Sequence, residues 1–161
     1  MMLMDRAAIA DVVTNLAHAQ ADKNWEVMRQ LFADQVHLDM SQQSNGPILD
    51  LSAEQLADLA RSTLEGFDCT HHFTANVEMQ LDGSRARCRV HAIAYHQLLT
   101  EPGVTDFCTM RGYWHLVLQK TGGRWLIEQW AMERAAPWEG DPSVYQLAAA
   151  AAAARSSAST D

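Results

Sequence analysis

The stretch "FDCTHHFTANVEMQLDGSRARCRVHAIAYHQLL", residues 67–99, decides the fold. Apolar and polar residues alternate with a period of two on both sides of the dipeptide Asp82-Gly83. Such alternation is typical of strands with one buried face, and Asp-Gly favours a tight hairpin turn. The stretch therefore predicts a long antiparallel hairpin.

The segments on either side complete an α+β domain. Residues 107–120 and 125–134, separated by the turn "TGGR", predict a second hairpin. Before residue 67, three helices are expected, and their predicted caps are Asp5, Asn24 and a capping box of Ser52 with Gln55. Helices followed by consecutive antiparallel strands predict helices packed on a strongly curved sheet.

Length and composition narrow the class of protein. The 161 residues suit one domain, predicted over residues 1–146 and followed by an alanine-rich, disordered tail at 147–161. Twelve basic and 20 acidic residues give a net charge of −8, which disfavours nucleic-acid and anionic-membrane partners. With no signal-peptide pattern and no paired-cysteine motif, a cytoplasmic location is expected.

The adjacent residues His71 and His72 first suggest a metal site. Successive strand side chains point to opposite faces, so the two imidazoles cannot easily share one ion. The sequence contains no HExxH or CxxC motif, and it has no nucleophile elbow or glycine-rich phosphate loop. We therefore expect neither a metal nor another cofactor, and no covalent intermediate.

Four pieces, in this order and spacing, resemble the SnoaL-like branch of the nuclear-transport-factor-2-like superfamily. They are "DRAAIADVVTNLAHAQADKNWEVMRQLFADQVHLD", "THHFTANVEMQLDG", "GGRWLIEQW" and "PWEGDPSVY", and the resemblance covers roughly residues 5–146. It implies a cone-shaped α+β roll around a deep pocket. Relatives include scytalone dehydratase, bile acid 7α-dehydratase, hexachlorocyclohexane dehydrochlorinase, polyketide cyclases and ketosteroid-isomerase-like proteins.

The resemblance also implies a site. His72 matches the histidine that lyase-like members use at the start of the strand after the third helix. Those members also use an aspartate near the end of the first helix, where this chain has Ala21 followed by Asp22, and a tyrosine where it has Leu16. His72 and Asp22 are the catalytic candidates, and Leu16 and Met40 are pocket candidates.

The alternation of side chains along the strand restricts which face His72 can occupy. Val77, Met79 and Leu81 are expected to face the core, which in a regular strand would direct His72 to the opposite face. A β-bulge between Phe73 and Asn76 would return His72 to the pocket, and bulges are common near active sites.

The remaining pocket candidates come from the later strands. In the central strand, alternation places Cys88, Val90, Ala92, Ala94 and His96 on the inner face. Pairing Lys120 with Trp125 across the second turn makes Met110, Trp114 and Gln129 inner residues. The pocket set is thus Leu16, Met40, His96, Met110, Trp114 and Gln129. The outer face would carry Tyr113, His115, Trp130 and Met132, an apolar surface that predicts a homodimer.

Two readings of function remain open. The first is a cofactor-independent lyase or isomerase acting on a small hydrophobic alcohol or carbonyl compound, with His72 removing a proton and Asp22, His96 or Gln129 assisting. The second is a non-catalytic module of the same fold that binds a small molecule or a protein. A subunit of a larger assembly, as in ring-hydroxylating dioxygenases, is a third and weaker possibility.

Overall fold

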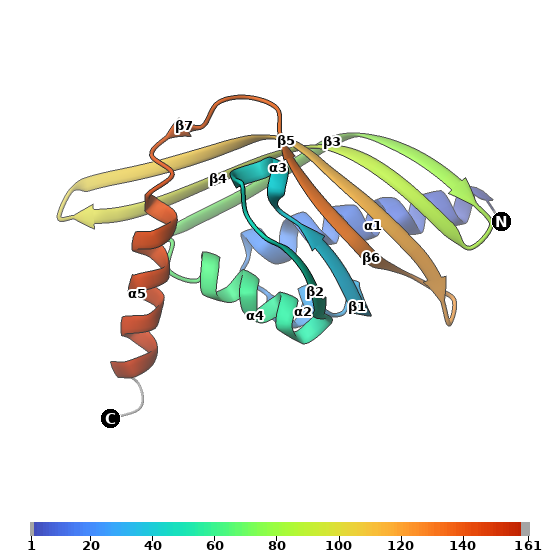
Figure 1. The fold of residues 1–161 in the computed structure, drawn as a ribbon, viewed down its shortest axis with the longest axis horizontal. Helices are drawn as coiled ribbons and strands as arrows, with labels where there is room; N and C mark the ends of the chain where they lie inside the picture. The colour runs from blue at the N-terminus through green and yellow to red at the C-terminus, as the bar shows by residue number, and fades with distance from the viewer. Residues whose placement is uncertain (1, 159–161) are drawn as a thin grey trace.

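The computed structural model describes residues 2–158 as helices packed against a strongly curved sheet (Figure 1). The helices are α1 Met2–Ala21, α2 Trp25–Arg29, α3 Ser41–Ser44, α4 Ala53–Leu64 and α5 Val144–Ala158. The strands are β1 Phe32–Asp39, β2 Ile48–Ser52, β3 Cys69–Asp82, β4 Arg85–Glu101, β5 Val104–Thr121, β6 Arg124–Arg134 and β7 Glu139–Gly140.

The sheet has the order β2-β1-β6-β5-β4-β3, and β7 pairs with β5. Neighbouring strands run antiparallel, except that β1 and β6 run parallel. Both predicted hairpins are present, and the α+β class is confirmed. The segment after Met40, predicted to be a loop, contains the short helix α3 and the edge strand β2.

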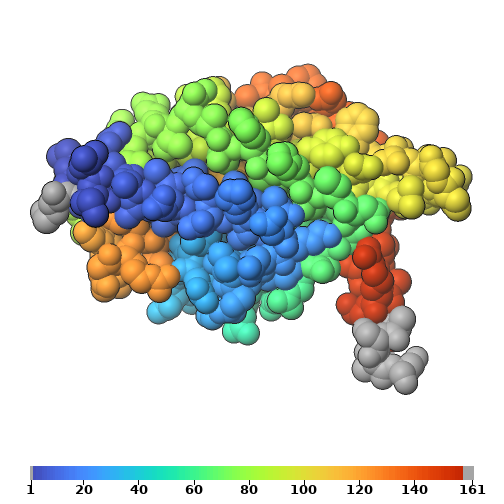
Figure 2. Space-filling model, turned by 180° about the vertical axis from the view of Figure 1, so that it is seen from behind, coloured from blue at the N-terminus to red at the C-terminus, as the bar shows by residue number. Residues whose placement is uncertain are grey.

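Helices α1, α2 and α4 cover one face of the sheet (Figure 1), and α1 crosses the molecule in the view from behind (Figure 2). Strand β4, predicted as the central strand, lies next to the edge strand β3. It shows the predicted alternation, since its inward residues are buried: Ala86, Cys88, Val90, Ala92, Ala94, His96 and Leu98. These side chains meet buried residues of the helices, among them Ile9, Val13, Leu16, Met28 and Leu56. The core therefore lies between the helices and the concave face of the sheet.

Strand β3 contains the bulge that the position of His72 required. Its pairing with β4 shifts between Ala75 and Glu78, and Asn76 has a left-handed φ of 51°. The extra residue lies slightly later than predicted, and Val77 is exposed there instead of facing the core. Beyond the bulge, Met79 and Leu81 pack against the core as expected.

Strand β6 contains a second bulge that the alternation of its residues does not predict. Leu118 pairs with Ile127 as expected, but Val117 pairs with Gln129, so Glu128 is the extra residue. One added residue exchanges the two faces of a strand. Gln129 therefore lies on the outer face, and the predicted outer residues Trp130 and Met132 face inward.

This exchange changes the surface proposed for dimerisation. Tyr113 and His115 remain on the outer face, where His115 Nε2 lies 2.7 Å from a carboxylate oxygen of Glu133. The face is thus less apolar than predicted, because Trp130 and Met132 have left it. The homodimer stays a prediction.

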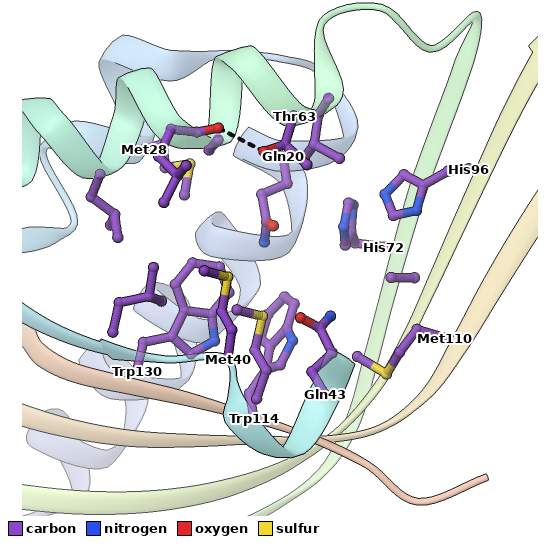
Figure 3. Close-up of a pocket in the computed structure, with 17 residues that line it drawn as sticks. Gln20, Met28, Met40, Gln43, Thr63, His72, His96, Met110, Trp114 and Trp130 are labelled. Carbon is purple, nitrogen blue, oxygen red and sulfur yellow. Dashed lines mark hydrogen bonds between the residues drawn. The ribbon is translucent and has the colours of Figure 1, made fainter. Parts of the chain in front are cut away.

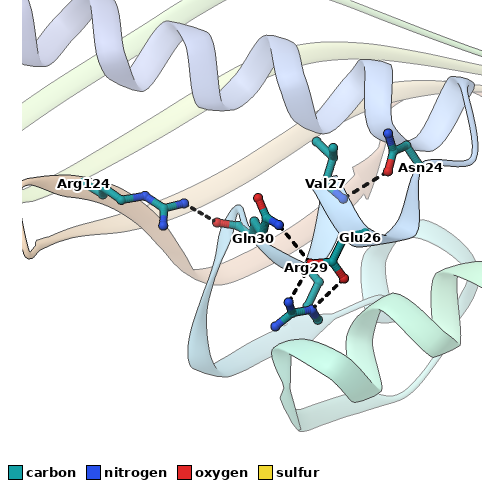
Figure 4. A network of polar contacts seen from close by, with 6 residues as sticks. All are labelled: Asn24, Glu26, Val27, Arg29, Gln30 and Arg124. Atoms are coloured by element: carbon teal, nitrogen blue, oxygen red, sulfur yellow. Dashed lines mark hydrogen bonds and ion pairs between the residues drawn. The ribbon is translucent and has the colours of Figure 1, made fainter.

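Local capping explains where the short helices begin. Asn24 accepts a hydrogen bond from the Val27 N–H at the start of α2, and the neighbouring Glu26 binds Arg29 and Gln30 (Figure 4). The capping box at the start of α4 is present as predicted. Asp5, by contrast, does not cap a helix. It lies within the first turns of α1 and accepts hydrogen bonds from two side chains of the second hairpin, Lys120 and Trp125.

The C-terminal segment differs from the prediction of disorder, because residues 147–158 belong to helix α5. Alanine has the highest helix propensity, and packing adds to it: Val144 and Ala148 are fully buried. Arg155 also donates a hydrogen bond to the carbonyl of Gly66. Residues 159–161 of the predicted tail lie outside the described residues.

Gly66 permits α5 to lie close to the end of α4, and this gives a first prediction. A Cβ added at Gly66 would lie 1.7 Å from the carbonyl oxygen of Ala148, so Gly66→Ala must displace one backbone. We expect it to lower the free energy of unfolding by about 1–3 kcal/mol, the usual cost of overpacking. Chemical denaturation measures this, with exposed Ser62→Ala as the control. Equal stability of the two variants would contradict the close approach.

Candidate functional site

A cavity of about 110 Å³ lies between the helices and the inner face of the sheet. Figure 3 draws its 17 lining residues, most of which are apolar. The apolar ones are Met28, Leu38, Met40, Leu56, Leu59, Ala60, Leu64, Ala94, Met110, Trp114, Trp130 and Met132, and the polar ones are Gln20, Gln43, Thr63, His72 and His96. Such a site suits a small, largely apolar ligand held by a few polar contacts.

His72 reaches this cavity from the start of β3. It pairs across the sheet with Ala94, another lining residue, and the bulge after Ala75 lets His72 face inward before it while Met79 and Leu81 face inward after it. Its ring centroid lies 6.3 Å from that of Trp114. The neighbouring His71 is exposed on the other face. The two adjacent histidines are therefore separated as strand alternation predicts.

His96 is the second imidazole of the cavity, and its side chain is only 2% exposed. Its ring centroid lies 5.1 Å from that of His72 with the rings at 68°, so the two pack edge to face. Nδ1 of His96 lies 2.8 Å from the hydroxyl of Tyr145 on α5. Phe67 packs against both the His96 ring and the Tyr145 ring.

Two nitrogens of this pair have no hydrogen-bond partner among the described residues. They are Nδ1 of His72 and Nε2 of His96, and both are buried. Leaving a buried polar group unpaired costs about 1–3 kcal/mol, so a polar group of a ligand that comes within hydrogen-bond distance of either nitrogen would gain a favourable contact. Both nitrogens belong to rings of residues that line the cavity.

Burial sets the charge state of both histidines. It lowers the pKa of His72 to about 4, with a smaller effect from the nearby His71. It lowers the pKa of His96 to about 3, again with a smaller effect from His72. Desolvation penalises the charged form of an imidazole, so both rings are neutral at neutral pH.

No carboxylate accompanies the histidines, since none of the described residues that line the cavity is charged. The carbonyl of Ala21 accepts a hydrogen bond of 2.7 Å from the Thr70 hydroxyl, which ties the end of α1 to the start of β3. Asp22 is exposed and lies away from the cavity. The residue of α1 that enters the cavity is Gln20, which is 5% exposed (Figure 3).

Helix α3 contributes to the wall of the cavity through Gln43. Arg134 of β6 donates a hydrogen bond of 2.9 Å to the Gln43 carbonyl and holds the helix against the sheet. Asp39 lies just before α3 and accepts hydrogen bonds from the backbone and the hydroxyl of Ser41, which lower its pKa. In this place Asp39 supports the backbone, while Met40 lines the cavity.

The structure brings together five of the predicted site residues: Met40, His72, His96, Met110 and Trp114. Leu16 is fully buried in the core but does not line the cavity, and Asp22 and Gln129 are exposed outside it. Gln20 was not predicted, although its spacing of four residues from the buried Leu16 places it on the same face of α1. Trp130 and Met132 were missed because of the bulge at Glu128.

Two further findings concern the described residues as a whole. No group of three or more His, Cys, Asp or Glu side chains within residues 2–158 is arranged to hold a metal ion. No helix within the same residues is both long and apolar enough to cross a membrane.

The sequence matches a known protein family, and the structure is similar to several solved structures. A family model described as a SnoaL-like domain matches residues 1–131, and no curated protein matches the chain. The structure is similar to that of the Kfla4162 protein from Kribbella flavida, with a TM-score of 0.81 and 20% identity over 86% of this chain and 95% of the other. It is also similar to a hexachlorocyclohexane dehydrochlorinase, LinA type 2, with a TM-score of 0.72 and 14% identity over 89% of this chain and 93% of the other. It is similar as well to the structure of Rv3472 from Mycobacterium tuberculosis, a protein of unknown function. The TM-score is 0.72, and the identity is 15% over 95% of this chain and 96% of the other.

Proposed function

The chain belongs to the SnoaL-like family, and from this premise we propose that it is a cofactor-independent lyase or isomerase. Its substrate is a small hydrophobic alcohol or carbonyl compound. His72 is the base that removes a proton from carbon, and His96 is the polar group that contacts the substrate oxygen. The proposal rests on fold-family membership together with the chemistry of the cavity.

The observation that carries the proposal is that His72 lines an apolar cavity and that its buried Nδ1 has no hydrogen-bond partner among the described residues. A base acts only from within hydrogen-bond reach of the proton it removes. In a dehydration, Nδ1 takes the proton of a C–H bond whose electron pair forms a new double bond. The C–O bond breaks as this double bond forms, and the departing hydroxyl keeps the electron pair of that bond, takes the proton from His72 and leaves as water. In an isomerisation, His72 returns the proton to a different carbon.

The low pKa of His72 restricts which substrates can react. The neutral ring is available as a base at neutral pH, but its protonated form is unfavourable in a dry cavity. A carbonyl substrate offsets this cost, because the electron pair moves onto the carbonyl oxygen and places a negative charge near the imidazolium. This favours carbonyl compounds over simple alcohols.

A second candidate function is a ligand-binding module without chemistry. One observation favours it: among the described residues that line the cavity, no carboxylate stands beside His72 to orient its ring or to stabilise its positive charge. Such a module would use the same cavity and the same unpartnered nitrogens to hold a small hydrophobic ligand.

A ligand screen followed by turnover distinguishes the two. Steroid, polyketide and terpenoid compounds are screened by thermal shift, because a ligand that binds the folded state raises its melting temperature. Hits are then assayed for loss of water or for double-bond migration. For a compound that is converted, we expect His72→Gln to lower kcat by about 10²- to 10⁴-fold, the usual contribution of a general base.

The control for this variant is His71→Gln, which removes the adjacent but exposed imidazole. It is expected to leave kcat unchanged. Equal turnover by His72→Gln and the wild type would remove His72 as the base. Hits that bind but are never converted would favour the binding module.

A further inference from the structure

The contact between Tyr145 and His96 connects the C-terminal helix to the cavity. Tyr145 lies in the first turn of α5, and its hydroxyl is 2.8 Å from Nδ1 of His96, which lies 49 residues earlier in the chain. The SnoaL-like match ends at residue 131, so the family model does not cover Tyr145. The contact joins a residue of that matched region, His96, to a helix that follows it.

The direction of this hydrogen bond decides which nitrogen of His96 carries a proton. Burial raises the pKa of Tyr145, so its hydroxyl stays protonated and needs an acceptor. Among the described residues, Nδ1 of His96 is the partner found for this hydroxyl. If Nδ1 carried a hydrogen, that hydrogen would face the phenol oxygen while the phenol O–H was left unpaired and buried. Donation from Tyr145 to an unprotonated Nδ1 satisfies both groups.

A neutral imidazole with an unprotonated Nδ1 carries its hydrogen on Nε2. Nε2 of His96 is buried, has no partner within residues 2–158, and belongs to a ring that lines the cavity beside His72. It is thus a hydrogen-bond donor available to a ligand.

We propose that Tyr145 is a positioning residue that holds His96 with its proton on Nε2, so that the cavity recognises the oxygen of a carbonyl compound. The catalytic part of this proposal rests on the proposed function. The tautomer and the recognition of a carbonyl group do not depend on it.

The proposal assigns different tasks to the two histidines. Full proton transfer from neutral His96 would leave an imidazolate or, if the Tyr145 proton followed, a buried phenolate, and burial disfavours both anions. His96 therefore donates a hydrogen bond and keeps its proton, as a neutral histidine can when it polarises a carbonyl. His72 takes the proton from the carbon next to the carbonyl, and the electron pair moves onto the oxygen that His96 Nε2–H contacts. In an elimination the electron pair then returns from the oxygen to form the new C=C bond, the C–O bond breaks with its pair on the departing hydroxyl, and that hydroxyl takes the proton from His72 and leaves as water. In an isomerisation the pair returns to bind the proton of His72 at a different carbon.

The packing around Tyr145 fixes the position of its hydroxyl. The Tyr145 ring meets the edge of Phe67 at 5.3 Å and the Trp138 ring at 6.0 Å between centroids. Val144 and Ala148 are fully buried on the same helix, and Gly66 permits its close approach. A phenylalanine at position 145 would keep the ring contacts and lose only the hydroxyl.

The test is the tautomer of His96, read from two-bond ¹H–¹⁵N correlations of uniformly ¹⁵N-labelled protein at neutral pH. In the wild type we expect His96 with Nε2 protonated and Nδ1 unprotonated. In Tyr145→Phe we expect the ratio of the Nε2-protonated to the Nδ1-protonated tautomer of His96 to fall by about tenfold, the equivalent of one hydrogen bond. Protonated Nδ1 in the wild type, or an unchanged preference in Tyr145→Phe, would overturn the proposal.

Tyr113→Phe is the matched control, because Tyr113 packs edge to face on His91 at 4.8 Å on the outer face of the sheet. It removes a tyrosine hydroxyl beside a histidine, and the tautomer of His96 is expected not to change. A change of equal size would show that the effect is not specific to Tyr145. Gly66→Ala gives a second route, since displacement of α5 is expected to weaken the same preference.

Carbonyl recognition has its own probe, cyclohex-2-enone, whose C=O stretching frequency falls when the oxygen accepts a hydrogen bond. We expect the band of the bound probe to lie at lower frequency in the wild type than in His96→Phe. Absence of saturable binding, or equal frequencies in both proteins, would overturn the assignment of a carbonyl ligand. Neither spectroscopic experiment requires turnover, so failure of the proposed reaction would be seen separately in the His72→Gln assay.

Discussion

The free energy of unfolding is expected to fall steeply as the pH drops from about 6.5 towards about 4, the pKa of the half-buried His72. Burial lowers the pKa values of His72 and His96 from 6.5 to about 4 and about 3. In this range the unfolded chain binds protons at both rings while the folded chain does not. Protonation therefore favours the unfolded state, and the stability present above pH 6.5 is lost as the pH falls.

Each histidine contributes a slope of about 1.4 kcal/mol per pH unit between its unfolded and its folded pKa. Denaturant titrations at several pH values between 7 and 5 would measure the combined slope. The choice of range matters, because carboxylates titrate mainly below it. The fall should be reversible when the pH is restored.

His72→Gln isolates one half of this effect. The variant is expected to be less dependent on pH than the wild type by about 1.4 kcal/mol per pH unit, since it removes one of the two groups. His71→Gln, at the exposed neighbouring position, should keep the wild-type slope. Parallel curves for the wild type and His72→Gln would mean that His72 is not held neutral by burial.

Replacement of Trp114 by alanine is expected to cost about 3–5 kcal/mol of unfolding free energy, the usual range for a buried aromatic residue. Trp114 is 1% exposed and meets Trp130 edge to face at 5.5 Å between ring centroids. It also forms a wall of the cavity beside His72. The change removes a large contact surface at a place where the neighbouring rings cannot easily close the gap.

Trp138→Ala is the control for this variant. Trp138 is partly buried, packs against Tyr145 and has the guanidinium of Arg134 above its ring at 5.3 Å. Removal of the Trp138 side chain should lower the free energy of unfolding clearly less than Trp114→Ala does, because part of the Trp138 surface is already in water. Equal losses, measured by denaturant unfolding, would contradict the central place of Trp114 in the core.

Much of the fold follows from local sequence patterns. The alternation in β4 predicted which residues are buried, and the Asp-Gly and Gly-Gly turns predicted both hairpins with the correct pairing of Lys120 and Trp125. The caps at Asn24 and Ser52 were also predictable, because a side-chain oxygen beside unpaired backbone N–H groups has a fixed local geometry.

The two bulges show where such reasoning stops. The bulge in β3 was predictable because two requirements conflicted: Met79 and Leu81 had to face inward, and so did His72. The bulge at Glu128 produced no such conflict, since both faces of β6 carry apolar residues and either assignment satisfied the pattern. Gln129 and Trp130 were therefore assigned to the wrong faces.

The partner of His96 could not be predicted for a different reason. Tyr145 meets His96 only because α5 folds back against α4, and that arrangement depends on the close approach at Gly66. The alanine run predicts a helix but carries no hydrophobic pattern that would direct one face of it to a particular surface. Local sequence therefore predicts that helix α5 forms but does not predict where it packs.

The position of Tyr145 makes the C-terminal helix part of the cavity as well as part of the core. The hydroxyl that contacts His96 comes from α5, and Val144 and Ala148 of the same helix are fully buried. Removal of α5 would therefore take away the partner of His96 Nδ1 and uncover part of the core. One change near the end of the chain can thus affect the stability of the fold and the polarity of the cavity together.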